Sequence, residues 1–197
     1  MRRRFPACLI GLALLGPACA EEAPQRSAAE LMDVLMWNRE PVGGPFALID
    51  QDGRPRTDAD FRGRLVILTF GYTGCPDVCP TDLMAIAQAL DRLGAAGDAI
   101  QPVFVTLDPA RDTSATLAEF VPSFHPRLIG LTGSEAAIRQ TADAFKVFYR
   151  REENTIEHSA FVYLLDREGR YLGFFPPGTS AERMLTIIRP HLLPPQR

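Results

Sequence analysis

Two cysteines with three residues between them, Cys75 and Cys79, are the residues of this chain best suited to chemistry. A thiolate is both a nucleophile and a ligand for soft metal ions, so a close pair of thiolates can exchange with disulfides or bind metal. A purely structural disulfide is a weaker interpretation, because closing so small a ring removes little entropy from the unfolded chain. We therefore interpret the pair as a redox or metal site.

The pattern around these cysteines predicts the elements that position them. An apolar run at 65–70 predicts a buried strand, which breaks at Gly71 and Gly74. From Pro80 to residue 93 the apolar residues share one helical face, and Pro80 suits the first position of a helix. Both sulfurs are therefore expected on a loop that leads into a helix N-terminus. The positive end of the helix favours thiolate over thiol there.

A histidine could complete a metal site with the two cysteines. Two thiolates are good ligands for Cu(I), and one imidazole would make the site trigonal. The chain has three histidines. His158 directly precedes the apolar strand predicted at 160–165, a position that faces the cysteine loop in a thioredoxin-type sheet. We interpret His125 and His191 as ordinary loop and helix residues.

The remaining pattern predicts an α/β fold, a thioredoxin-like three-layer sandwich with an additional β-hairpin and an N-terminal extension. Helices are expected at 28–37, 80–93, 114–121, 135–145 and 180–191. Strands are expected at 46–50, 65–70, 102–107, 127–131, 160–165 and 171–175, and residues 150–155 are expected to form a polar loop.

The first twenty residues have the pattern of an export signal. Three arginines precede a short apolar run, and Ala18-Cys19-Ala20 fits a small-residue cleavage site. We expect an export signal at 1–20, a spacer with a short helix at 21–44, and a thioredoxin-like copper-binding domain at 45–195. The protein is then exported to the periplasm. Two alternatives stay open: the leader is retained as a membrane tether, or Cys19 is lipidated.

Charge and cysteine content narrow the function further. The formal net charge is −3, and loss of the leader with its three arginines and no acid makes it −6. An acidic domain is not expected to bind nucleic acid. Cleavage also removes Cys8 and Cys19, so that Cys75 and Cys79 are the cysteines of the exported domain.

Four stretches of the chain resemble the SCO/SenC family, the copper proteins that assist assembly of cytochrome c oxidase. They are residues 69–80 (TFGYTGCPDVCP), 105–113 (VTLDPARDT), 146–149 (KVFY) and 158–166 (HSAFVYLLD). The stretches occur in the family's order and span nearly the whole predicted domain.

The resemblance implies a thioredoxin-like protein that binds copper, as Cu(I) or Cu(II), through Cys75, Cys79 and His158. It implies delivery of copper to the binuclear site of cytochrome c oxidase or another exported cuproprotein, or reduction of that site's cysteines, and contact with other copper chaperones. Asp77, Asp108 and Tyr72 match family positions near the metal, where we expect them to surround it without binding it.

Three other functions compete with that of a copper protein. An exported thiol–disulfide reductase or redox sensor would need Cys75 and Cys79 but not His158. A peroxidase is disfavoured, because Pro76 stands where peroxiredoxins carry the threonine that activates their cysteine. A structural binding module would keep its function without either thiol.

Overall fold

A computed structural model describes residues 28–37, 40–76, 78–153 and 155–192, and the side chains of 28–31, 37, 78 and 79 lie outside this description. Its helices are α1 (Ala28–Trp37), α2 (Val78–Leu93), α3 (Ser114–Phe120), α4 (Glu135–Ala144) and α5 (Ala181–Leu192). Its strands are β1 (Ala47–Asp50), β2 (Pro55–Thr57), β3 (Leu65–Gly71), β4 (Ile100–Thr106), β5 (Ile129–Thr132), β6 (Tyr149–Arg151), β7 (Ile156–His158), β8 (Val162–Leu165) and β9 (Tyr171–Phe175).

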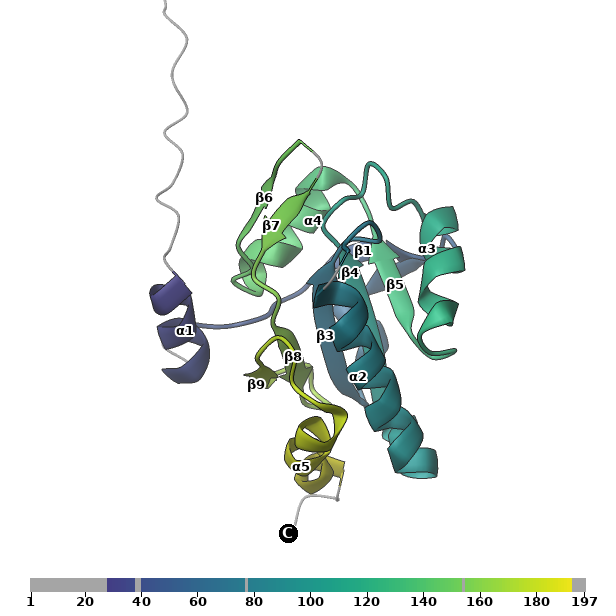
Figure 1. Cartoon of the computed structure of the whole chain (residues 1–197), viewed down its shortest axis with the longest axis vertical. Coiled ribbons are helices and arrows are strands. Elements are labelled where there is room, and N and C mark those ends of the chain that lie inside the picture. The colour runs from purple at the N-terminus through teal and green to yellow at the C-terminus, as the bar shows by residue number, and fades with distance from the viewer. Residues whose placement is uncertain (1–27, 38–39, 77, 154, 193–197) are drawn as a thin grey trace, which may run out of the picture.

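Seven strands form one sheet in the order β2-β1-β5-β4-β3-β8-β9, while β6 and β7 form a separate two-stranded ribbon (Figure 1). Strands β3, β4 and β5 run parallel, and β8 pairs antiparallel with β3. The carboxyl ends of β3 and β4 therefore meet at one edge of the sheet. This edge is where the cysteine loop begins.

Helices cover both faces of the sheet, which makes the three-layer sandwich that the sequence predicts. Along β3, Val66, Leu68 and Phe70 pack in the cluster that includes α1 and α4. The intervening Leu65 and Ile67 pack in the cluster that includes α2, α3 and α5. Because both faces are buried, every position of the strand is buried, and all but Thr69 carry no polar side chain.

Helix α2 begins at Val78, two residues before the start predicted from Pro80. Proline is tolerated throughout the first turn of a helix, because the N–H groups there have no partner within the helix. The prediction that both sulfurs lie on a loop is therefore wrong for Cys79, whose backbone belongs to the first turn of α2. Cys75 does lie on the loop.

The polar loop predicted at 150–155 is shorter in the structure, because Arg150 and Arg151 belong to β6 and pair with β7 in a ribbon that the sequence did not predict. Tyr149 lies opposite His158, and Arg151 lies opposite Ile156. The outward side chains are charged, and the Arg150 guanidinium donates to Glu157 at 2.7 Å. Ile156 is the buried residue of the ribbon that ties it to the core.

The other sequence predictions of helices and strands agree with the structure to within a few residues. Helix α1 spans the predicted residues 28–37, and Ser134 caps α4 by accepting the Ala137 N–H at 3.2 Å. Within the described ranges no helix has the length and apolar composition needed to cross a bilayer. The predicted export signal lies outside the described residues.

Candidate functional site

The cysteine loop starts where β3 ends, at the carboxyl edge of the parallel strands. The Gly71 carbonyl accepts the Leu107 N–H at 2.7 Å, which continues the β3–β4 pairing into the loop. The Cys75 N–H donates to the Tyr72 carbonyl at 3.1 Å and closes a turn. The side chain of Cys75 is half-buried and packs against the apolar cluster on the α4 face of the sheet.

A buried carboxylate that sequence reasoning did not single out holds this loop in place. Asp112 is 1% exposed, and its carboxylate accepts the Thr73 N–H at 2.9 Å, the Thr73 hydroxyl and the Thr106 hydroxyl at 2.6 Å. The Thr132 hydroxyl donates to the Asp112 carbonyl at 2.8 Å. Asp112 thus fixes the residue two positions before Cys75 to the ends of β4 and β5. Its place in the sequence suggests a turn and gives no sign of these long-range contacts.

His158 lies at the end of β7, and the ribbon sets the direction of its ring. The next residue, Ser159, donates its N–H to the Phe148 carbonyl at 2.9 Å, and its hydroxyl accepts the Phe148 N–H at 3.0 Å. The His158 Nδ1 lies 3.3 Å from the Ser159 carbonyl oxygen. Because a carbonyl can only accept, this bond places the proton on Nδ1 and the lone pair on Nε2. Metal-binding histidines characteristically make such a bond through the other ring nitrogen.

Burial keeps the His158 imidazole neutral. Desolvation lowers the pKa of the ring below its ordinary value, and this effect outweighs the bond to the Ser159 carbonyl, which raises it. A neutral imidazole is the form that binds metal, so near neutral pH the ring does not need to lose a proton first.

Tyr72 connects the histidine to the cysteine loop. Its ring is 6% exposed and meets the His158 ring edge to face, with 6.3 Å between centroids and 81° between planes. The same residue accepts the Cys75 N–H through its carbonyl. The structure thus brings Cys75, Tyr72 and His158 to the same edge of the sheet from positions far apart in the sequence.

Of the two acidic residues predicted to lie near the metal, the structure describes Asp108. Both carboxylate oxygens of Asp108 are taken up by arginines, with Arg111 at 2.6 Å and Arg151 at 2.8 Å. Asp108 therefore ties the end of β4 to β6. Asp77 lies outside the described residues.

The donor set suits a soft metal ion. The side chain of Cys79 is not described, and among the side chains that are, no group of three histidines, cysteines or acids surrounds a common point. A metal at this edge could take a sulfur from Cys75 and an imidazole nitrogen from His158, and the backbone of Cys79 lies in the first turn of α2. Sulfur and imidazole donors without carboxylates favour copper or zinc over magnesium or calcium.

Comparison with known proteins identifies the family. The SCO1/SenC family model matches residues 36–192. An SCO2-like protein of Rickettsia prowazekii is 38% identical over 92% of this chain and 91% of its own length.

Two solved structures with copper bound are similar to this fold. Arabidopsis thaliana ScoI has a TM-score of 0.73 and 37% identity, covering 77% of this chain and 98% of that one. Yeast Sco1 has a TM-score of 0.73 and 32% identity, covering 79% and 92%. With a match from residue 36 to residue 192, this chain belongs to the SCO1/SenC family.

Proposed function

We propose that this protein is a copper metallochaperone that holds Cu(I) or Cu(II) through Cys75, Cys79 and His158. The observation that carries the proposal is the His158 ring, which contacts Tyr72 of the cysteine loop and directs its Nδ1 to a backbone carbonyl. This orientation leaves Nε2 as the nitrogen able to bind a metal. The copper-bound structures of similar proteins support copper as the ion.

The chemistry of the donors favours copper transfer over permanent storage. Two thiolates and an imidazole match Cu(I), whereas a structural zinc site usually has four protein ligands. The exported part of the chain has no second cysteine pair to supply the fourth. A three-ligand site next to a loop leaves room for a ligand from a recipient to enter before the first ligands leave.

The recipient we propose is the binuclear copper site of cytochrome c oxidase or another exported cuproprotein. Export follows from the leader pattern, and the same segment would hold the protein at the membrane if it is retained or lipidated. Under this proposal the site works in the periplasm, where contact with other copper chaperones would load it.

Copper binding under a competing chelator tests the proposal. The reduced chain is titrated with Cu(I) and Cu(II) beside Cys75→Ala, Cys79→Ala and His158→Ala, with His191→Ala as a control on α5. We expect one copper per chain, lost on either cysteine change and unaffected by the control. His158→Ala should weaken Cu(II) more than Cu(I), because two thiolates still hold Cu(I) linearly. Wild-type protein that cannot compete with the chelator would refute the proposal.

A thiol–disulfide reductase is the second candidate, and the position of Cys79 in the first turn of α2 favours it. A helix N-terminus stabilises thiolate, which attacks a disulfide. One thiolate would attack a disulfide of a partner, form a mixed disulfide with one of the partner's sulfurs and release the other as a thiolate. The second cysteine would then resolve it, so that the partner gains two electrons and Cys75 and Cys79 become a disulfide. Rapid exchange with a peptide disulfide, without copper binding, would favour this function.

A further inference from the structure

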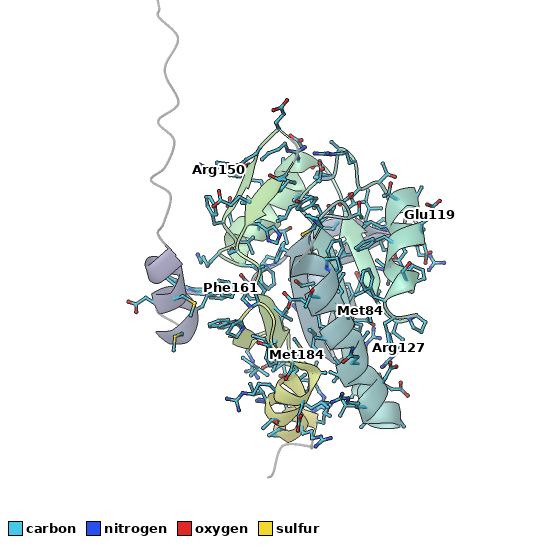
Figure 2. The ribbon with its side chains drawn as sticks, viewed as in Figure 1. Met84, Glu119, Arg127, Arg150, Phe161 and Met184 are labelled. Carbon is cyan, nitrogen blue, oxygen red and sulfur yellow. The ribbon has the colours of Figure 1, made fainter. Side chains whose placement is uncertain are left out.

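A cavity of about 470 Å³ lies between the end of β4, the start of α4 and strand β6. Its volume is in the range of sites that hold small ligands or a few side chains. Its polar lining consists of three arginines, one tyrosine and one glutamate: Arg139, Arg150, Arg151, Tyr149 and Glu135. Figure 2 marks this side of the molecule by Arg150, away from Met84 on α2. Although the chain as a whole has a negative net charge, arginines outnumber acidic residues in this lining, and such a cavity favours an anionic ligand.

Arg139 is the cation of this lining that stays available to such a ligand. Its guanidinium carbon lies 4.4 Å from the centre of the Tyr149 ring. Within the described part of the chain, Arg150 and Arg151 pair with Glu157 and Asp108, and no carboxylate lies within 4 Å of the Arg139 guanidinium. A guanidinium over an aromatic ring keeps N–H groups for hydrogen bonding, and its planar fork can donate two parallel bonds to a carboxylate.

The start of α4 adds to the positive potential of the cavity. Glu135, the first residue of the helix, and Ala136, the second, line the cavity together with Arg139 one turn later. The positive end of the helix therefore faces the same space as the guanidinium. The Glu135 side chain is 75% exposed, and its carboxylate lies 3.7 Å from the Arg151 guanidinium, so it partly neutralises Arg151.

The cavity borders the ribbon that carries His158. Tyr149, whose ring lies against the Arg139 guanidinium, is the direct cross-strand partner of His158. Opposed residues of an antiparallel pair project to the same face, so a molecule seated at Tyr149 lies beside the histidine. We propose that the cavity is the docking site for an acidic segment of the protein that receives copper, with a glutamate or aspartate carboxylate on Arg139. This inference rests on the proposed function.

Peptide binding to the reduced full-length chain tests the proposal. The probes are capped hexaglutamate, capped hexaglutamine and inorganic phosphate, each titrated by calorimetry at low salt and at about 0.15 M salt. Arg139→Gln removes the stacked cation, and Arg183→Gln removes an exposed arginine of α5 as the matched control. We expect saturable binding of hexaglutamate that Arg139→Gln weakens about tenfold and Arg183→Gln leaves unchanged. The higher salt concentration should weaken hexaglutamate binding.

Several results would overturn the docking site. One is equal affinity of the two variants for hexaglutamate, and another is hexaglutamine binding as tightly as hexaglutamate. A third is phosphate binding as tightly as the peptide, which would indicate a site for small anions. Copper affinity is measured in the same variants and should not change. Loss of copper affinity in Arg139→Gln would place the arginine in the metal site instead. Wild-type chain that binds hexaglutamate but no copper would refute the copper function and this role of the cavity together, whereas copper binding without peptide binding refutes the docking site alone.

Discussion

Replacing Asp112 by alanine should destabilise the protein strongly although the residue touches no proposed metal ligand. Its carboxylate is buried and accepts three hydrogen bonds, two from Thr73 and one from Thr106. Alanine leaves all three donors without this acceptor. The perturbation therefore tests whether Asp112 fixes the cysteine loop to the sheet.

The expected loss follows from the burial of the donors. Thr106 is fully buried, so its unsatisfied hydroxyl should cost about 1–3 kcal/mol. Thr73 is half-exposed and water can replace part of its two bonds, so it should add about 1 kcal/mol. The total of about 2–4 kcal/mol is below the stability of a typical domain, about 5–15 kcal/mol, and the variant should still fold.

Urea unfolding of the reduced, copper-free chain measures this loss, with Asp52→Ala as the control. Asp52 pairs with Arg54 on the surface, and its removal should change the unfolding free energy by at most about 0.5 kcal/mol. Copper affinity of Asp112→Ala should fall with the loosened loop. A loss of stability below about 1 kcal/mol would refute the role assigned to Asp112.

The same unfolding assay checks three further changes. Burial raises the pKa of Asp82, so its ionised form is unfavourable in the folded state, and its contribution to stability is lost as pH rises through the folded pKa. Asp82→Asn, which can still accept the Gly178 N–H, should raise the free energy of unfolding at neutral pH and change it little below pH 3.8. An equal change in the free energy of unfolding at the two pH values would contradict this. Gly130→Ala should cost about 1–3 kcal/mol, because its Cβ would come within 2.8 Å of Val121; a neutral change would mean that Val121 yields. The buried Tyr163 hydroxyl has no hydrogen-bond partner in the described structure, so Tyr163→Phe should be neutral or stabilise by about 1 kcal/mol, and a clear loss would reveal a partner.

The elements that frame the site could be predicted because their sequence patterns are local and strong. The apolar run of β3 and the helical spacing after Pro80 are each sufficient to assign a strand and a helix. The sequence predicts His158 just before a strand at 160–165, whereas in the structure it ends a separate strand, β7, four residues before β8 begins at Val162. The prediction that it faces the cysteine loop agrees with its contact to Tyr72.

The parts that could not be predicted depend on contacts between distant residues. The β6–β7 ribbon is polar on its outer side and has one strongly buried residue, Ile156, so it lacks the alternation that marks a strand. Asp112 meets Thr73 across 39 positions of the chain, and no local pattern encodes that meeting. The ion pair of Asp108 with Arg151 could not be predicted for the same reason, because the two residues are 43 positions apart.

The separation of the β6–β7 ribbon from the main sheet has a consequence for how a bound metal would pass to a recipient. A two-stranded ribbon is marginally stable alone, and proteins open such units without unfolding as a whole. We expect the amide hydrogens of β6 and β7 to exchange with solvent faster than those of β3, which has a partner strand on each side. His158 could then leave a metal ion while Cys75 stays in place. Opening of this one ribbon would then free a coordination position for a ligand of the recipient, while the two cysteines still hold the ion.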